Sequence, residues 1–194
     1  MALPKHTKLT EQEYHALEAA SQIKHEFVNG EVYAMTGGSQ AHNDISDNIY
    51  GLLFVALRGG RCRAHHSDMA LKVEATGDTF YPDITIVCGE RAFADDAPVA
   101  TLLNPVTIIE VLSPSTELYD RTTKFDDYRQ IPTLKDYVLV AQDQPRIDVY
   151  SRRDDDAWVL TPLDGLDAAL YVPAVDVTLP LTDILKRALG IHTV

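Results

Sequence analysis

Residues 106–112 form a nearly continuous apolar run that contains a single carboxylate, Glu110. Such a run is typical of a central β-strand that is covered on both faces, so the chain must place further structure on either side of a sheet. Charged side chains are almost never buried without an opposite charge or a metal ion beside them. Glu110 is therefore the first candidate for a functional residue, since it lies near the carboxyl end of the strand. The alternative is a glutamate at a solvated strand end, or one in a structural pair with an arginine.

Hydrophobic spacing and turn residues predict the remaining elements. Helices are expected over residues 9–20, 40–57, 122–131 and 180–189, and further strands over residues 61–65, 69–74, 83–88, 136–141, 147–151 and 158–162. Asn29-Gly30 is a strong signal for a two-residue hairpin turn, which would pair Phe27 with Val32. Helices and strands in this order predict a mixed α/β (α+β) fold with a central mixed sheet flanked by helices.

Length, targeting signals and cysteine content narrow the class of protein. The 194 residues contain no repeat and no convincing linker, so we expect residues 1–194 to form a single domain. No apolar run is long enough to cross a bilayer and no secretory signal is visible, which predicts a cytoplasmic protein without a membrane partner. Cys62 and Cys88 do not form a Cys-x-x-Cys pair and are expected to be buried, reduced thiols.

Asp83 and His42 occupy positions that suit a functional site. Asp83 follows Pro82, which cannot donate a ladder hydrogen bond and suits the start of a strand, so Asp83 would project where the strand emerges. Taken alone, Asp83 could as well be an ordinary turn aspartate. His42 lies three residues before Ile45 and seven before Ile49, so it heads the buried stripe of its helix. A histidine whose hydrogen bonds are satisfied within the core is an equally good interpretation of this position.

Lys124 lies on the predicted helix that follows the Glu110 strand. Residues spaced by four and seven share a helical face, so Lys124 aligns with Tyr128 and Ile131, which we expect to point inward. A lysine on that face either extends its charge to solvent or points at an anionic group. The neighbouring positions that are expected to form a solvated surface are Asp120, Arg121, Asp126 and Asp127.

One set of segments carries a family resemblance. The set comprises Pro82-Asp83, the run Glu-Val-Leu-Ser-Pro-Ser-Thr that begins at Glu110, Lys124 with Tyr128, the run Glu-Phe-Val-Asn-Gly-Glu that begins at Glu26, and the helix with His42. These segments resemble the Uma-type putative restriction endonuclease family of the PD-(D/E)xK nuclease superfamily, and the resemblance spans residues 8–160. It implies a restriction-endonuclease-like core with the site at a split in the sheet.

The resemblance also implies a role for each of these residues. Asp83 and Glu110 would bind Mg²⁺ or Mn²⁺, with the backbone carbonyl of Val111 as a third ligand. The catalytic lysine of the superfamily normally follows the acidic residue by two positions, where this chain has Leu112, and the implied substitute is Lys124. The other implied roles are those of Glu26 as a further catalytic carboxylate, His42 as a contact to a ligand or phosphate, Ser113 as a hydrogen-bond partner of Glu110 or of the following loop, and Tyr128 as a supporting residue beside Lys124.

The implied function is metal-dependent hydrolysis of phosphodiester bonds in DNA by an endonuclease, and cutting two strands would suit a homodimer. A non-catalytic nuclease-fold module for binding or assembly is the alternative. The formal net charge of −12 favours this alternative, because it argues against an extensive phosphate-binding surface. Arg58, Arg61 and Arg63 form the only dense basic group in the sequence, which is small for a surface that binds duplex DNA.

Overall fold

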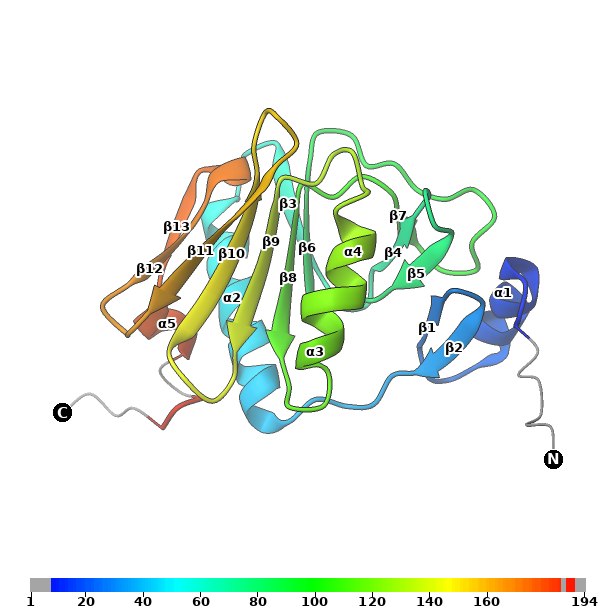
Figure 1. Cartoon of the computed structure of the whole chain (residues 1–194), viewed down its shortest axis with the longest axis horizontal. Coiled ribbons are helices and arrows are strands. Elements are labelled where there is room, and N and C mark those ends of the chain that lie inside the picture. Colours follow the sequence, from blue (N-terminus) through cyan, green and yellow to red (C-terminus); the bar gives the residue numbers. More distant parts are fainter. Residues whose placement is uncertain (1–7, 186–187, 191–194) are drawn as a thin grey trace.

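The computed structural model describes residues 8–185 and 188–190, and within them the central sheet has six strands (Figure 1). The strands lie in the order β11 (Trp158–Asp164), β10 (Arg146–Arg152), β9 (Asp136–Ala141), β8 (Thr107–Leu112), β6 (Ile84–Cys88) and β3 (Cys62–His66). β8 and β9 are parallel, and the other neighbouring strands are antiparallel. The apolar run therefore forms an interior strand of a mixed sheet, as predicted.

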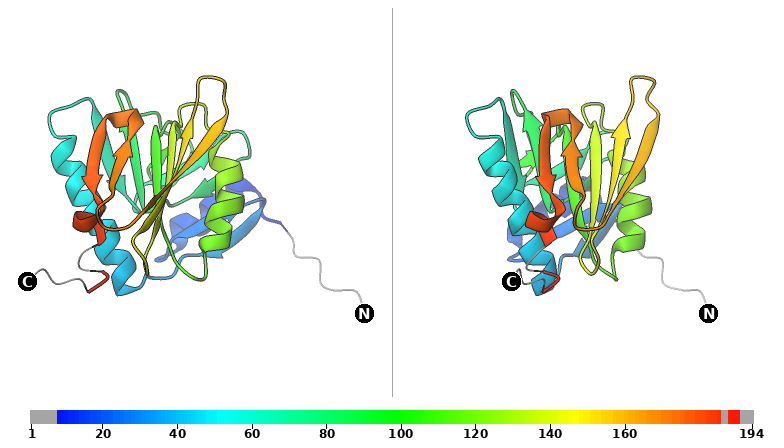
Figure 2. Two further views of the ribbon diagram at one scale, coloured as in Figure 1. Left: turned by 60° about the vertical axis from the view of Figure 1, so that its left-hand side comes forward. Right: turned by 90° about the vertical axis from the view of Figure 1, so that its left-hand side faces the viewer.

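Other elements cover both faces of this sheet (Figure 2). One face carries α2 (Gln40–Ala56), the hairpin of β12 (Ala169–Val172) and β13 (Val177–Pro180) with the 3-10 turn η2 (Pro173–Val175) between its strands, and α5 (Leu181–Leu185). The opposite face carries α3 (Glu117–Tyr119), the π-helical turn η1 (Asp120–Lys124) and α4 (Phe125–Tyr128), which form one continuous helical segment. This arrangement confirms the predicted mixed α/β fold with a mixed sheet flanked by helices.

A second, smaller sheet contains the predicted hairpin. Its order is β2 (Glu31–Ala34), β1 (His25–Val28), β5 (Asp78–Phe80), β4 (Ala70–Val73) and β7 (Thr101–Leu102), and α1 (Glu11–Ala20) lies next to the hairpin in Figure 1. Asn29 and Gly30 have φ angles of 51° and 82°, the left-handed backbone that this type of hairpin turn requires. Phe27 pairs with Val32, as the turn signal predicted.

Two apolar clusters pack against opposite faces of β8, because successive side chains of a strand alternate between its faces. Ile109 and Val111 belong to the cluster that includes α2 and the β12–β13 hairpin. Ile108 and Leu112 belong to the cluster on the side of α4. Glu110 has the same parity as Ile108 and Leu112, so its carboxylate enters the apolar layer beneath α4.

The first two helices begin where their capping residues indicate. Thr10 accepts a hydrogen bond from the amide of Glu13, and the Glu13 carboxylate accepts one from the amide of Thr10, which is a complete capping box. Ser39 caps α2 by accepting the amide of His42, so His42 is fixed in the first turn of that helix. None of the helices in residues 8–185 and 188–190 combines the length and the apolar character that a membrane crossing requires.

Several predicted bounds differ from the structure. The helix expected over residues 122–131 begins at Glu117 and ends at Tyr128, because the apolar Leu118 is exposed and hides the helical pattern at its start. The helix expected over residues 180–189 corresponds to α5, which begins at Leu181 because Pro180 belongs to β13. Residues 186–187 of the expected helix lie outside the described residues. Strands β5, β7, β12 and β13 were not predicted, because strands of two to four residues give little alternation to detect.

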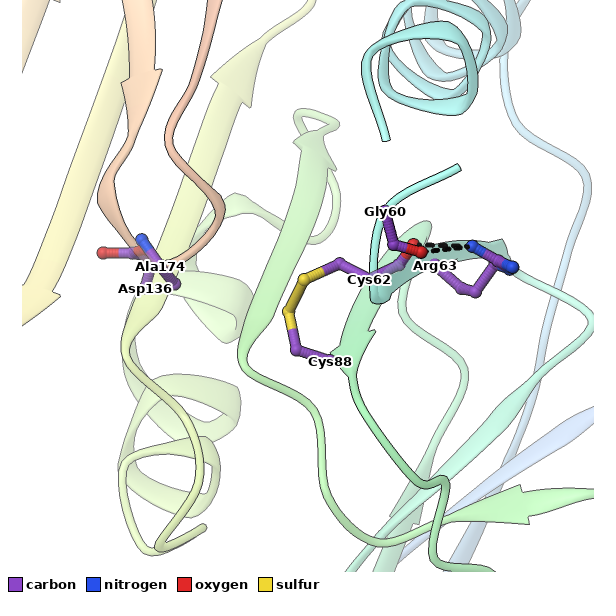
Figure 3. The surroundings of a disulfide bond; sticks show 6 residues. All are labelled: Gly60, Cys62, Arg63, Cys88, Asp136 and Ala174. Carbon is purple, nitrogen blue, oxygen red and sulfur yellow. Dashed lines mark hydrogen bonds between the residues drawn. A yellow bond between two sulfur atoms is a disulfide. The ribbon is translucent and has the colours of Figure 1, made fainter. Parts of the chain in front are cut away.

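The prediction of reduced thiols is wrong, because Cys62 and Cys88 form a disulfide (Figure 3). The two residues are direct partners in the antiparallel pairing of β3 with β6, and their Cα atoms lie 4.0 Å apart. Their separation of 26 residues along the chain gives no sign of this pairing. Only the strand register brings the two sulfur atoms together, and the bridge ties the edge strand β3 to its neighbour.

Candidate active site

Asp83 and Glu110 face each other at one end of the central sheet. Ile84 of β6 pairs with Ile109 of β8 in antiparallel register, so Asp83, which precedes Ile84, lies opposite Glu110, which follows Ile109. The Asp83 amide donates to Oε2 of Glu110 over 3.2 Å, and the Val111 amide donates to Oδ2 of Asp83 over 2.7 Å. Backbone hydrogen bonds thus hold the two predicted carboxylates side by side.

Lys124 lies buried between three carboxylates. Its ammonium nitrogen is 3.1 Å from Oε1 of Glu110, 3.1 Å from Oε1 of Glu26 and 3.3 Å from Oδ1 of Asp120. The side chain is only 8% exposed, so it does not extend its charge to solvent. Of the two possibilities that the helical face left open, contact with anionic groups is the one that the structure shows.

Asp120 and Asp127 are buried, which corrects the expectation of a solvated surface on this helix. Arg121 and Asp126, the other two residues of that surface, are at least partly exposed. Asp120 was missed as a site residue because the polar residues around it suggest a solvated face. Its spacing of four residues from Lys124 was the available signal, since side chains at that spacing are neighbours on a helix.

Two tyrosines complete the surroundings of the carboxylates. Tyr128 of α4 donates its hydroxyl to Oε1 of Glu110 over 3.0 Å within the core. Tyr119 was not predicted; its ring centre lies 5.7 Å from the Lys124 ammonium, and its hydroxyl lies 3.5 Å from Oε2 of Glu26. Glu26 comes from β1, so the hairpin of the smaller sheet supplies one carboxylate to a site on the central sheet.

His42 contacts Asp83 from α2. Its Nε2 atom lies 3.1 Å from Oδ2 of Asp83, while its Nδ1 atom is buried and has no hydrogen-bond partner among the described residues. A Cβ atom at Gly38 would lie 2.7 Å from Nδ1, so a larger residue there would displace the imidazole. Among the described residues, the polar partner of the His42 ring is therefore Asp83, through Nε2.

Ser113 and Leu112 do not contact the carboxylates. The Ser113 hydroxyl lies 3.0 Å from that of Ser115 and 2.9 Å from that of Thr116, so it organises the loop before α3 and does not bond Glu110. Leu112 is buried in the apolar cluster on the side of α4. It lies two residues after Glu110, at the position for which the sequence resemblance implied Lys124 as a substitute.

The site holds more carboxylates than basic side chains. Burial is the main cause that raises the pKa of Glu110. The charge of Lys124 lowers this pKa and the charge of Asp83 raises it, so that the pKa of Glu110 is about 8. Burial alone would lower the pKa of Lys124, but the neighbouring carboxylates outweigh it and hold this pKa well above its usual range. The hydrogen bond to Asp83 raises the pKa of His42. The excess of negative charge favours either a proton on Glu110 or a cation bound beside it.

The donor atoms of Asp83 and Glu110 fit a hard divalent cation. Both contacts of the Asp83 carboxylate involve Oδ2, which leaves Oδ1 without a hydrogen-bond donor among the described residues. Mg²⁺ and Mn²⁺ prefer oxygen ligands, and Mg²⁺ commonly takes one or two carboxylates and keeps water in its other positions. In the described part of the chain, no three Asp, Glu, His or Cys side chains converge on one metal position. The residues therefore suit an ion that retains water, and not a closed structural metal site.

The mixed α/β fold of this chain is shared with a solved structure. A crystal structure described as a putative nuclease belonging to DUF820, from Anabaena variabilis, is similar to it with a TM-score of 0.76. The similarity covers 93% of this chain and 99% of that chain at 18% sequence identity. At this identity, the likeness shows the shared fold.

The chain belongs to the Uma2 family, whose model is described as "Putative restriction endonuclease" and matches residues 11–182. Two Synechocystis proteins are similar to it over most of their length. "Uncharacterized protein slr1290" is 38% identical over 160 residues, which are 82% of this chain and 83% of that protein. "Uncharacterized protein sll1609" is 35% identical over 162 residues, which are 84% of this chain and 91% of that protein. The resemblance to the Uma-type family found in the sequence is confirmed.

Proposed function

We propose that the protein is a metal-dependent endonuclease that hydrolyses phosphodiester bonds in DNA with Asp83, Glu110 and Lys124. The observation that carries this proposal is the placement of the Asp83 and Glu110 carboxylates at one strand end, with the Lys124 ammonium 3.1 Å from Glu110. Membership of a family whose model is described as "Putative restriction endonuclease" supports a nucleic acid as the substrate.

Asp83 and Glu110 would hold Mg²⁺ or Mn²⁺, with the backbone carbonyl of Val111 as a further ligand. When bound, the ion supplies a water of lowered pKa and offsets the negative charge that develops on the phosphate. The protein contributes orientation, since the Val111 amide and Nε2 of His42 both hold Oδ2 of Asp83. This fixes the carboxylate plane and keeps its other oxygen available.

Lys124 supplies positive charge at a fixed position. Its contacts with Glu110, Glu26 and Asp120 hold the ammonium in place before substrate arrives, so no reorganisation is needed when charge develops on the phosphate. Glu26 acts through Lys124, as one of its three carboxylate partners. A lysine at the position of Leu112 would lie on the same face of the sheet as Glu110. In this chain, the lysine on that face comes from the helical segment instead, as Lys124.

A plasmid nicking assay with Mg²⁺ or Mn²⁺ tests the proposal. The wild type should convert supercoiled plasmid to the nicked form, and Asp83→Asn and Glu110→Gln should each slow this by at least about 100-fold. Asp155→Asn, at an exposed position in the β10–β11 turn, is the matched control and should retain the wild-type rate. Equal residual activity in the wild type and both site variants would sink the assignment.

A non-catalytic binding or assembly module is the second candidate function. It is favoured by the absence of the strand lysine at Leu112 and by the net charge of −12. Titration calorimetry with Mn²⁺ separates the two candidates without an activity readout. Binding at millimolar Mn²⁺ by the wild type that is lost in Asp83→Asn supports the nuclease, and no binding by either supports the module.

A homodimer belongs to the same proposal, because two sites are a common means of cutting two strands. Light scattering coupled to size-exclusion chromatography should then give about twice the chain mass of 21.5 kDa. A mass equal to that of one chain at micromolar concentration would contradict the dimer without affecting the site.

A further inference from the structure

A pocket of about 820 Å³ lies where α2 ends and β6 finishes, at the opposite end of β6 from Asp83. Four arginines contribute to its wall, namely Arg58, Arg61, Arg63 and Arg91. Cys62 of the disulfide also lines the pocket, and Figure 3 shows the side chain of the next residue, Arg63, directed away from the bridge. The pocket is therefore separate from the carboxylate site and opposite to it in charge.

The pocket arginines differ from the other described arginines in their partners. Arginines elsewhere in the described residues each pair with an aspartate or glutamate; they are Arg121, Arg129, Arg146, Arg152 and Arg153. Within residues 8–185 and 188–190, none of the four pocket arginines has such a partner, although the chain has 29 acidic and only 17 basic side chains. In the described part of this acidic chain, these guanidinium groups therefore form a cluster without carboxylate partners.

Local structure accounts for only part of this charge. A helix C-terminus such as that of α2 carries about half a negative elementary charge, which a single arginine offsets. Arg63 has an internal role, because its Nη1 atom donates to the carbonyl oxygens of Gly60 and Cys62 over 3.1 and 3.2 Å (Figure 3). The arginines that remain available to an external anion are Arg58, Arg61 and Arg91.

An exposed aromatic ring lies along the same pocket. Phe54 is 58% exposed, and its ring centre lies 6.3 Å from that of the partly buried Tyr50, one turn earlier on α2. His65 adds a buried Nε2 atom that has no hydrogen-bond partner within the described residues. Guanidinium groups without carboxylate partners beside an exposed ring are the combination that binds single-stranded nucleic acid, because phosphates contact the cations and a base stacks on the ring.

We propose that this pocket binds a single-stranded nucleic-acid segment, with Arg58, Arg61 and Arg91 on its phosphates and Phe54 stacked on a base. Duplex DNA suits the pocket less well, since its bases are already stacked on both faces and three arginines make a small footprint for a duplex. The binding does not depend on the proposed cleavage, because none of the pocket residues belongs to the carboxylate site.

Fluorescence anisotropy with the full chain and a labelled oligothymidylate of about 15 nucleotides tests the proposal, in EDTA so that no cleavage occurs. The variant R58Q/R61Q/R91Q is matched by R129Q/K135Q/R153Q, which removes the same charge from exposed positions elsewhere. The pocket variant should weaken binding by at least about tenfold, and the control variant by less than about twofold. Only the pocket variant should flatten the plot of log binding constant against log salt concentration, by about 0.7 in slope for each lost phosphate contact.

Phe54→Ala separates base stacking from charge. It should weaken binding of oligothymidylate but leave binding of inorganic polyphosphate unchanged, since polyphosphate has no bases. Thermal melting by circular dichroism verifies that each variant folds. Equal losses in the two triple variants, no binding of oligothymidylate by the wild type at about 50 mM salt, or tighter binding of a duplex of equal length would each overturn the proposal. Loss of nicking with intact oligothymidylate binding would affect only the nuclease proposal.

Discussion

At the residue scale, Lys124 is the buried charge on which the carboxylate cluster depends. Its ammonium is the shared partner of Glu110, Glu26 and Asp120. Lys124→Met would leave these carboxylates buried without an opposite charge, which should lower the free energy of unfolding by about 3–5 kcal/mol. Urea unfolding at neutral pH measures the change, with the exposed Lys135→Met as a control that should stay within about 0.5 kcal/mol. A loss no larger in Lys124→Met than in the control would contradict this account.

Asp127 is a buried carboxylate of α4 outside the site, and it should make stability depend on pH. Burial first, and then the charge of Asp78, raise the pKa of Asp127 to about 6, whereas its value in the unfolded chain is about 4. Between these values the folded state binds the proton more tightly, so the stability of the fold falls as pH rises through this window. The full cost is present at neutral pH.

Asp127→Asn should therefore be more stable than the wild type at pH 7, and the gain should shrink as the pH falls towards about 4. Urea unfolding at a series of pH values measures this gain. Asp126→Asn, on the exposed side of the same helix, should show no such trend. A gain that is constant from pH 4 to 7 would mean that another property of the substitution, and not the carboxylate charge, is responsible.

Single residues were predictable where their surroundings in the sequence made them exceptional. Glu110 was found because a carboxylate inside an apolar run needs a partner, and Lys124 because it shares a face with apolar residues. Asp120 and Tyr119 were not found, because polar and aromatic residues at the start of a helix are ordinary. Their importance comes from their proximity to Lys124 in the fold, which the hydrophobic pattern does not show.

At the element scale, the disulfide fastens the edge strand β3 to β6. It closes a segment of 26 residues, for which chain entropy predicts a contribution of about 3.5 kcal/mol to stability. Cys62→Ser with Cys88→Ser should lower the free energy of unfolding by roughly that amount in urea. Reduction with dithiothreitol should destabilise the wild type similarly and leave the double variant unchanged. Two free thiols in the unreduced wild-type protein, by thiol titration, would show that the bridge does not form.

Elements were predictable where one local signal determines them. The apolar run gives β8, the Asn29-Gly30 turn gives the β1–β2 hairpin with its register, and Ser39 gives the start of α2. The disulfide was not predictable, because it depends on how β3 aligns with β6, and alternation within one strand does not determine its neighbour. The β12–β13 hairpin was missed for the same reason as the other short strands.

At the scale of the whole molecule, the carboxylate site exists only in the folded chain. Glu26 comes from the smaller sheet, Asp83 and Glu110 from the central sheet, and Lys124 and His42 from helical segments on its opposite faces. The sequence could supply these residues as candidates, but their distances follow from the packing of both sheets. A metal that binds here therefore binds the native state and not the unfolded chain.

Such binding should stabilise the fold by mass action. Mn²⁺ at about ten times its dissociation constant should add about 1.4 kcal/mol to the free energy of unfolding of the wild type. Asp83→Asn should lose this gain, and the surface variant Asp155→Asn should keep it. Thermal unfolding with and without Mn²⁺ measures the effect. Equal shifts in the wild type and in Asp83→Asn would place the binding of Mn²⁺ elsewhere on the protein.

The most direct test of the proposed metal site is anomalous diffraction from crystals of the protein soaked in Mn²⁺. The account predicts an anomalous peak in contact with carboxylate oxygens of both Asp83 and Glu110, and no such peak in crystals of Asp83→Asn. Wild-type crystals with no peak at this position, or with a peak that persists in Asp83→Asn, would contradict it.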